Sequence, residues 1–389
     1  MITPAALLLA GCGMEEEVEV VESSREAKII GTAEIPEAFI SGKGKRFVLR
    51  GPAKFVADPV WPPKSDSSNE ASRAERGRSE DEMTREELAH AFRPVMLHKG
   101  HEYILEKPDY EFADAVIAAR GKELKTEGSE GRATVKNAVD LTPGLTEAQA
   151  VLGTDTREQK RDNTTFPSRT RVFITNGNMT GACSGQLIGP TTILTAAHCV
   201  HNGTGWLSTR SWSPGVDSQD ANAFPYQGGS TYPDTSGNAP IAGCYKAMVS
   251  SEWASGDTSV SYDFAFLELG SMYPEGCGFD PGNDLGWHGL WVASEAAIED
   301  RSGNLYGYPA EKATWPQIWG GTGPVTDEGV ALWYDIDTTG GQSGSAVYMF
   351  DNAEVRYVVG IHKGFNGDLN YGRKMTTGLY TWLVTHTAL

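Results

Sequence analysis

From about residue 166 onward, the sequence predicts an all-β fold of closed antiparallel barrels. Short runs of β-branched and aromatic residues alternate there with Gly, Pro, Asn, Asp and Ser, and the whole chain contains 45 glycines. Regularly spaced short strands with turn residues between them are typical of such barrels. The final segment, Met375 to Leu389, has apolar residues at helical spacing, which predicts a terminal helix. The runs that predict strands are RVFIT, GQLIG, TTILTAA, YKAMVS, DFAFLEL, VALWYDI, SAVYMF and YVVGIHK.

The part of the chain before residue 150 has a different composition. At 389 residues the chain is long enough for more than one folding unit. Residues 13–149 open on the acidic run GMEEEVEVVESS, and the stretch from Pro62 to about Glu87 is rich in Ser, Glu, Arg and Pro. Segments of this kind have little to bury and stay disordered. We expect 13–149 to be a tether and propeptide, partly disordered and without a catalytic constellation.

Two parts of 13–149 have patterns of their own. Residues about 26–60 contain the apolar patches KIIGTAEI and RFVLRGPAKFV, which predict a small β unit. Residues 86–125 alternate alanines, leucines and charges in a helical pattern that Pro94 and Pro108 interrupt.

The first twelve residues predict export. Residues 1–12 end in LLLAGC, which resembles the bacterial lipobox, whose cysteine becomes acylated and begins the mature protein; that residue is Cys12 here. No Lys or Arg precedes the short apolar run, so an ordinary secretory signal with an incidental cysteine is the alternative. Both interpretations place the protein outside the cytoplasm, either secreted or anchored to the cell envelope.

Charge and hydropathy exclude two classes of partner. The formal net charge is −18, whereas phosphate binding needs a basic footprint, so nucleic acid is not expected as a partner. No apolar run approaches the length of a membrane-spanning helix, so a lipid on Cys12 would be the sole membrane contact.

Two distant motifs indicate nucleophilic catalysis. Ser343 lies in TTGGQSGSAVY, and His198 lies in LTAAHCV. A serine hydroxyl attacks well when a neighbouring imidazole takes its proton. The carbonyl oxygen under attack becomes negative, and glycines let a tight turn aim backbone N–H groups at it. We expect the N–H groups of Gly341 and Ser343 to form this oxyanion hole.

Asp263 is the candidate that completes the group. The imidazole needs an acceptor on its second nitrogen, and Asp263 lies in SYDFAFLEL, where a polar stretch enters an apolar run. The chain order His198, Asp263, Ser343 resembles that of the chymotrypsin-like serine peptidases. That resemblance implies two six-stranded barrels, at about 165–275 and 285–375, with the catalytic residues in the cleft between them.

The cysteines predict two disulfides. Cys183 and Cys199 flank the segment that delivers His198, and Cys244 and Cys277 bracket the Asp263 strand. Both bridges would persist only outside the reducing cytosol, and the alternative is buried thiols.

The region from about Ala150 to the C-terminus resembles the glutamyl endopeptidases, bacterial enzymes that cut after glutamate. The matching pieces are AVLGTDTREQKRDNTTFPSRTRVFI, CSGQLIGPTTILTAAHCV, SYDFAFLEL, LGWHGLW, YGYPA, IDTTGGQSGSAVY and GIHKGFNG. The resemblance implies that Thr338 and His362 bind the substrate carboxylate. It also implies a mature α-amino group near Ala150, released by cleavage after about Gln149, and hence a zymogen.

Asp337 favours a different specificity. It lies six positions before the nucleophile, where trypsin-like enzymes keep the aspartate that binds Arg or Lys, so cleavage after basic residues is the alternative. Lys363 favours an acidic substrate, and Gly364 and its neighbours would pair with the substrate backbone as an added strand. In the trypsin branch, an aspartate directly before the nucleophile pairs with the new amino terminus. Gln342 stands there, which excludes that ion pair.

The sequence therefore predicts an exported, monomeric serine endopeptidase that acts on peptides and proteins. A surface binding protein on an inactive peptidase scaffold is the alternative from another class. We expect no metal site and no organic cofactor, because the oxygen-rich turns DNAE and FNGDLN lack the spacing of a calcium loop.

Overall fold

The computed structural model describes residues 35–56, 78–131, 151–160, 166–176, 181–207, 209–215, 228–229, 245–270, 280–312 and 317–389. Residues Glu37–Leu389 form one compact unit, and Met1–Pro36 form a separate one. Nothing below concerns the remaining residues. Cys12, the acidic run after it, most of 62–87 and the predicted processing site near Gln149 lie outside the described residues.

The second barrel is a closed ring of six strands, as predicted. Its ladder order is β20-β17-β18-β19-β22-β21, and β20 pairs with both β17 and β21, which closes the ring. Leu305, Leu332, Val347 and Val359 are among the buried apolar side chains that fill it. The strands are β17 (Ser302–Gly307), β18 (Trp319–Glu328), β19 (Ala331–Tyr334), β20 (Ala346–Phe350), β21 (Arg356–Phe365) and β22 (Asn370–Lys374).

The six strands of the first barrel run in the order β14-β15-β10-β9-β8-β12 within an eleven-stranded sheet. No ladder between described residues joins β12 to β14, so this part of the chain shows an open run of strands rather than a closed ring. Beyond β14 the sheet continues into strands that come from before residue 150. The six strands are β8 (Arg171–Asn176), β9 (Gly181–Leu187), β10 (Thr192–Thr195), β12 (Thr209–Pro214), β14 (Lys246–Ser250) and β15 (Ala265–Glu268).

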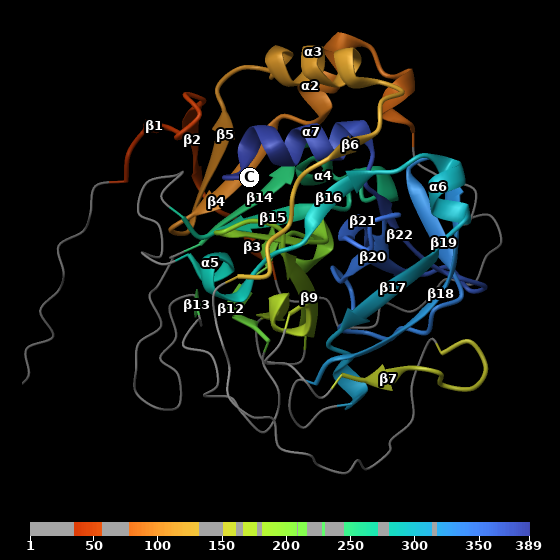
Figure 1. Ribbon diagram of the computed structural model, residues 1–389. Helices are drawn as coiled ribbons and strands as arrows, with labels where there is room; N and C mark the ends of the chain where they lie inside the picture. Colours follow the sequence, from red (N-terminus) through yellow and green to blue (C-terminus); the bar gives the residue numbers. More distant parts are fainter. Residues whose placement is uncertain are drawn as a thin grey trace, which may run out of the picture. The chain divides into compact units, whose positions relative to one another are not determined.

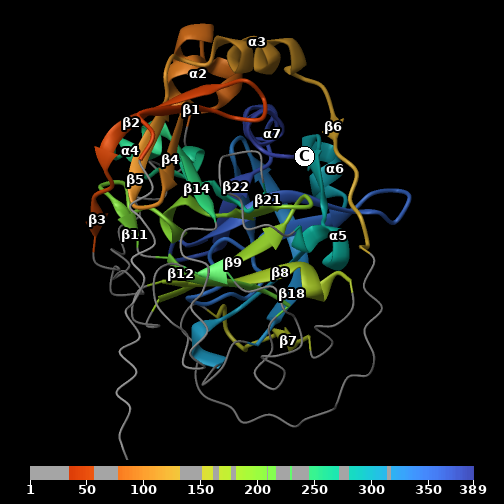
Figure 2. The same cartoon turned by 90° about the vertical axis from the view of Figure 1, so that its left-hand side faces the viewer.

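The described part of the N-terminal region is folded into the same unit as the barrels. A capping box between Thr84 and Glu87 starts α2, and Asp109 caps α3. In both views α2 and α3 lie on the side of the molecule that carries the C-terminal helix (Figures 1 and 2). The elements are β1 (Ala38–Ile40), β2 (Arg46–Pro52), β3 (Phe55–Val56), η1 (Glu80–Glu82), α2 (Arg85–Ala91), β4 (Pro94–His98), β5 (His101–Leu105), α3 (Tyr110–Ala119) and β6 (Leu124–Lys125).

The sequence pattern over 86–125 predicts helix, and the structure has two helices there, α2 and α3. Between them lies a β-hairpin that the pattern does not predict. Pro94 begins β4, and β4 pairs with β5 through a two-residue turn at Lys99 and Gly100, both with positive φ. A hairpin turn of this kind needs positive φ at both central residues, which glycine adopts without strain.

The predicted terminal helix is α7 (Thr377–His386), capped by Thr376. Trp382 is fully buried in it, with ring contacts to Phe264 and Phe266 at 4.9 and 5.1 Å between centroids. No described helix has both the length and the apolar character needed to cross a membrane. The remaining elements are β7 (Glu158–Gln159), η2 (Ser168–Thr170), η3 (Ala197–Cys199), β11 (Trp206–Leu207), β13 (Gly228–Gly229), α4 (Ser251–Ala254), η4 (Val260–Tyr262), α5 (Pro281–Leu285), β16 (Gly289–Val292), α6 (Glu295–Glu299) and η5 (Ala310–Lys312).

The aromatic core tests whether the N-terminal region belongs to the fold. Phe92 is fully buried and stacks on Phe264 at 5.8 Å between ring centroids. Replacing Phe92 with Ala should lower the free energy of unfolding by about 3–5 kcal/mol, because it opens a cavity in the core. The control Ile117→Ala, at a residue of α3 that is 39% exposed, should change it by no more than about 0.5 kcal/mol. Urea unfolding of both variants measures this, and equal stabilities would contradict it.

Candidate active site

The structure places His198 and Asp263, two of the predicted site residues, in contact. His198 lies in η3, directly after β10, and Asp263 lies between η4 and β15. The Nδ1 atom of His198 is 2.8 Å from Oδ2 and 3.1 Å from Oδ1 of Asp263, and the backbone N–H of His198 donates to Oδ1 at 3.0 Å. Because β10 pairs with β15 through Thr195 and Ala265, the sheet register sets this contact.

The Asp263 carboxylate is built to stay ionised. Its residue is 1% exposed, and burial alone would raise its pKa. The hydrogen bonds and charge of His198, and the ammonium group of Lys363 at 3.8 Å, outweigh burial and bring the pKa of Asp263 below its ordinary value. An ionised carboxylate on Nδ1 keeps the proton on that nitrogen and leaves Nε2 as the basic atom.

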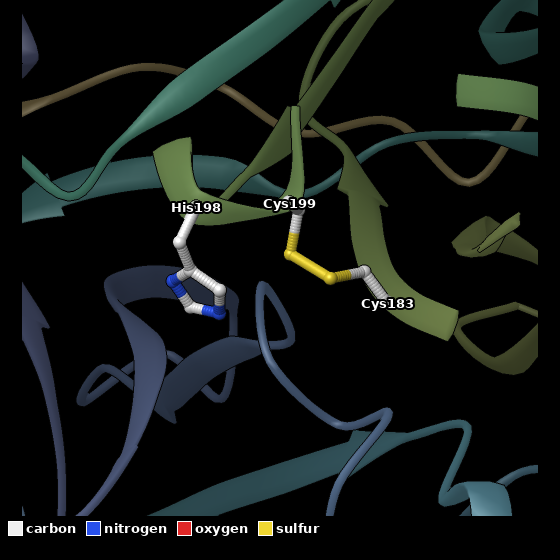
Figure 3. Close-up of side chains that lie close together, drawn as sticks. All are labelled: Cys183, His198 and Cys199. Carbon is white, nitrogen blue, oxygen red and sulfur yellow. A yellow bond between two sulfur atoms is a disulfide. The ribbon is translucent and has the colours of Figure 1, made fainter. Parts of the chain in front are cut away.

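A disulfide supports the histidine turn. Cys199, next to His198, is bonded to Cys183 of β9, which confirms one of the two predicted bridges (Figure 3). Cys244 and Cys277 lie outside the described residues, so the second bridge stays a prediction.

The turn that carries Ser343 can be made only with glycine on either side of the serine. Gly341 has φ +98° and Gly344 has φ +83°. A Cβ at Gly341 would lie 2.4 Å from the Tyr308 carbonyl oxygen, and one at Gly344 would lie 2.2 Å from the Ser184 carbonyl oxygen. The backbone of the turn therefore packs closely against the carbonyl groups of Tyr308 and Ser184. Ser343 itself is 3% exposed.

The turn that carries Ser343 contacts both the turn that carries His198 and β21. The Ser343 carbonyl accepts from Ser184 N at 2.7 Å and lies 3.6 Å from the Cys199 sulfur. The Ser343 hydroxyl donates to the Lys363 carbonyl at 3.2 Å. Attack on a substrate would require this hydroxyl to turn to Nε2 of His198, and such bonds often form only once substrate is bound.

The predicted oxyanion donors are available. Among the described residues, neither the N–H of Gly341 nor that of Ser343 donates a hydrogen bond. The neighbouring Gln342 N–H donates to Thr339 O, and the Gly344 N–H donates to His362 O. Two unused donors beside a serine hydroxyl are what a developing oxyanion needs.

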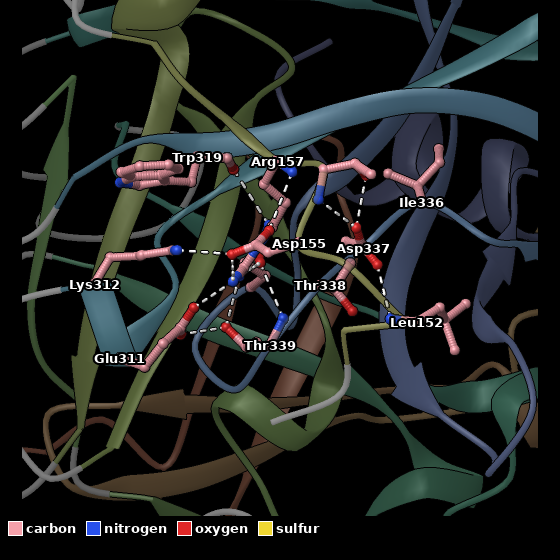
Figure 4. Close-up of polar contacts among 12 residues, drawn as sticks. Leu152, Asp155, Arg157, Glu311, Lys312, Trp319, Ile336, Asp337, Thr338 and Thr339 are labelled. Carbon is pink, nitrogen blue, oxygen red and sulfur yellow. Dashed lines mark hydrogen bonds and ion pairs between the residues drawn. The ribbon is translucent and has the colours of Figure 1, made fainter. Parts of the chain in front are cut away.

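Asp337 is bound to the protein itself. Its Oδ1 accepts from Leu152 N at 2.8 Å, and its Oδ2 accepts from the backbone N and the hydroxyl of Thr156 at 2.8 and 2.6 Å (Figure 4). The residue is 2% exposed. A carboxylate with both oxygens bonded in this way is not placed to receive a lysine or arginine side chain of a substrate.

The two residues implied to bind a substrate carboxylate are buried and hydrogen-bonded. Thr338 donates to Asn370 Oδ1 at 2.7 Å, and His362 Nδ1 is 2.7 Å from the Tyr334 hydroxyl. Burial, together with the charge of His198, lowers the pKa of His362 to about 3. The His362 imidazole is therefore neutral at neutral pH.

The other two residues expected to act on the substrate are Lys363 and Gly364. Lys363 donates to the Thr258 carbonyl at 2.7 Å, so its ammonium is directed toward the Asp263 side of the site. Gly364 lies at an irregularity in the β21 and β22 ladder, and a Cβ built on it would meet no atom within 4 Å. Open space beside this strand is compatible with an added strand of substrate.

Comparisons with known proteins agree with this geometry. The family model described as Trypsin matches residues 156–273. A protein named Glutamyl endopeptidase from Bacillus licheniformis is 30% identical over 201 residues, which are 51% of this chain and 55% of that protein. Residues 156–273 thus match the Trypsin family, and the chain is similar to a glutamyl endopeptidase. A protein named Extracellular metalloprotease from Bacillus subtilis is 29% identical over 290 residues, 72% of this chain and 83% of that protein.

Two further matches are shorter or more distant. A solved structure described as Glu endopeptidase in complex with MPD covers 61% of this chain and 100% of its own, at 26% identity and a TM-score of 0.49. A bovine protein named Inactive serine protease 35 is 47% identical over 60 residues, which are 15% of this chain and 13% of that protein.

The name of the Bacillus subtilis relative raises the question of a metal. The group of possible metal ligands among the described residues is Cys183, His198 and Cys199, whose ligand atoms lie within 4.8 Å of one another. The two sulfurs are joined in the disulfide, and His198 Nδ1 is on Asp263. A metal would need thiolates and an unoccupied imidazole nitrogen, so these residues do not fit one.

The sequence analysis missed Arg157, which joins the start of the peptidase domain to the nucleophile loop. Its side chain is fully buried, with Nε and Nη2 on Asp155 at 2.9 Å and Nη2 on Glu311 at 2.6 Å. Its Nη1 donates to the Thr339 hydroxyl at 2.9 Å and to Gln342 Oε1 at 3.0 Å (Figure 4). Nothing in the spacing of these residues signals the contact.

Replacing Arg157 with Met tests this connection. The change removes the buried guanidinium that contacts Asp155 and Glu311, although Lys312 still pairs with Asp155, and breaking such a buried pair should lower the free energy of unfolding by about 3–5 kcal/mol. The control Lys160→Met makes the same substitution at a side chain that is 40% exposed and should cost no more than about 0.5 kcal/mol. Denaturant unfolding measures both, and a neutral Arg157→Met would show that the network does not hold the loop.

Proposed function

We propose that this chain is an exported serine endopeptidase that hydrolyses peptide bonds through an acyl-enzyme, with a preference for glutamate on the acyl side of the cleaved bond. Ser343 is the nucleophile, His198 is the base and then the acid, and Asp263 orients the imidazole. The observation that carries this proposal is the buried bond between His198 Nδ1 and Asp263, at 2.8 Å, beside a serine turn with two unused N–H donors.

The proposed reaction uses these groups in sequence. Nε2 of His198 takes the Ser343 proton as the oxygen attacks the substrate carbonyl carbon, and the carbonyl oxygen becomes an oxyanion. The N–H groups of Gly341 and Ser343 donate to that oxyanion. The imidazolium then gives its proton to the leaving amine, so the C–N bond breaks and an ester on Ser343 remains. Water, activated by the same imidazole, hydrolyses the ester.

Three observations support the acidic preference over cleavage after Lys or Arg. Both Asp337 oxygens accept hydrogen bonds from the protein, so this carboxylate is not placed to bind the side chain of a basic substrate. Thr338 and His362 are held in place by Asn370 and Tyr334. A neutral imidazole can donate to a carboxylate, whereas the Thr338 hydroxyl would first have to release Asn370 Oδ1, and bonds to an ionised acceptor are about twice as strong as neutral ones. The relative named Glutamyl endopeptidase favours the same substrate class.

We also propose export, with Cys12 as a lipid anchor and cleavage near Gln149 as the maturation step. The name Extracellular metalloprotease, carried by a relative that matches 72% of this chain, supports an extracellular location. The bridge between Cys183 and Cys199 fits an oxidising compartment.

Replacing Ser343 with Ala tests the nucleophile. We expect cleavage of a glutamyl peptide to fall by a factor of about 10⁶, as in comparable triads. Ser345→Ala is the matched control, because Ser345 is a buried serine on the same loop and has no role in the proposed reaction. A fluorophosphonate probe should label the parent and Ser345→Ala, but not Ser343→Ala. Unchanged turnover in Ser343→Ala would rule out the assignment, and failure to label the processed parent would favour a binding protein on an inactive scaffold.

Replacing His362 with Gln tests the specificity pocket. Loss of a donor to the substrate carboxylate should lower kcat/KM for a glutamyl peptide by about 10- to 100-fold, and lower it much less for the matched glutaminyl peptide. Since the pKa of His362 is about 3, His362 does not titrate between pH 5 and 8. The acid limb of the kcat/KM profile should therefore stay where it is in the parent. A shifted acid limb, or equal losses for both peptides, would contradict the assigned role.

A further inference from the structure

The N-terminal region completes the sheet of the first barrel. β4 pairs antiparallel with β14 through Leu97 and Ala247, and on its other side β14 pairs with β15, which begins two residues after Asp263. β5 and β2 extend the same sheet. Without β4, the hydrogen-bonding groups of β14 would form an unpaired edge, and exposed edges of this kind drive aggregation.

The same region also covers apolar surface of the peptidase domain. Phe92 and Phe112 are buried with their rings 5.3 Å apart, and Phe92 stacks on Phe264, the residue after Asp263. The indole N–H of Trp382, in α7, donates to the Phe92 carbonyl at 2.8 Å. Phe264 and Trp382 have no exposed surface. Their burial depends on the N-terminal region, because Phe92 packs against both.

A buried ion pair crosses the same boundary. Glu80 of η1 contacts Arg373 of β22, and both side chains are almost completely buried. Arg373 Nε also donates to the Ser261 carbonyl at 2.9 Å, two residues before Asp263, and the Thr376 hydroxyl donates to Glu80 at 2.9 Å. If Glu80 left, Arg373 would be a buried cation without its carboxylate, which is strongly unfavourable.

The contacts reach the second barrel too. β6 pairs with β16, and the Trp291 indole N–H donates to Glu123 at 2.9 Å. Lys125 lies 3.1 Å from Asp351, and its carbonyl accepts from the Tyr380 hydroxyl at 3.0 Å. In both views β6 runs down beside α7 and the strands of the barrels (Figures 1 and 2). The described N-terminal region is thus attached to both halves of the peptidase domain.

From these contacts we infer that residues 37–56 and 78–131 are a permanent part of the working peptidase and are not a propeptide that leaves. Cleavage between residues 131 and 151, which rests on the maturation proposed above, gives an enzyme of two chains held together without a covalent link. If Cys12 is acylated, the matured catalytic chain then stays at the membrane surface through its N-terminal partner. Anchoring and processing are therefore compatible.

A chain with a cleavable link tests this inference. The recognition sequence of a site-specific protease is inserted between Asp140 and Leu141 of the full chain, and the cut and uncut proteins are run on gel filtration in native buffer and in urea. The cut fragments should elute together at the uncut position in native buffer, even after 100-fold dilution, and separate only in urea. Elution of a folded C-terminal fragment by itself in native buffer would overturn the inference.

The buried ion pair provides matched variants of the cut protein. Glu80→Ala should lower the urea concentration at which the fragments separate by about 1–2 M. Glu82→Ala, an exposed glutamate two positions along the same turn, should leave it unchanged. Equal separation of the two variants would overturn the inference that the ion pair holds the chains together. Gel filtration needs no turnover, so a failure of the proposed catalytic function would leave this result readable.

Discussion

The buried contact between Asp263 and His198 is the constraint on which the rest of the site depends. A buried carboxylate is stable only where cations and N–H donors compensate for the loss of water. Here the imidazole, the backbone N–H of residue 198 and the Lys363 ammonium supply that compensation. The turn after β10, which the Cys183–Cys199 disulfide supports, carries the imidazole and the N–H of residue 198, and β21 carries Lys363. Any loosening of these elements would therefore act first on the ionisation of Asp263.

Two buried arginines near the site, Arg157 and Arg373, are each paired with carboxylates. Arg157 meets two carboxylates behind the nucleophile loop, and Arg373 meets Glu80 behind the turn before Asp263. Pairs of this kind add little net stability compared with apolar packing, but they are costly to break. Their effect is to hold one arrangement of the loops, because every alternative arrangement leaves a charge buried without a partner.

The predicted site rests on local motifs, whereas the architecture around it leaves no such pattern in the sequence. The triad order, the glycines of the serine turn and the Cys183 bridge follow from local motifs, since each reflects a requirement at one short segment. The attachment of β4 to β14 does not, because pairing between segments about 150 residues apart leaves no local pattern. The same holds for Arg157, whose partners come from three separate segments. Asp337 shows that a position relative to a motif does not fix what a side chain binds. Its place in the chain predicts a contact with a substrate cation, whereas its oxygens accept from Leu152 and Thr156.

The hydrogen bonds of Gln342 bear on how the serine turn is ordered. In the trypsin branch the residue before the nucleophile is an aspartate that acquires its partner, a new amino terminus, only on cleavage. Here Gln342 is fully buried, and its Oε1 already accepts from Arg157 and from Thr339 N in the uncut chain. Its amide donates to the Trp319 carbonyl at 3.2 Å. The Gln342 side chain therefore already has hydrogen-bond partners and needs no new amino terminus. The serine turn can be ordered before any processing. The proposed cleavage near Gln149 would then act on the contact of Leu152 with Asp337 rather than on the serine turn.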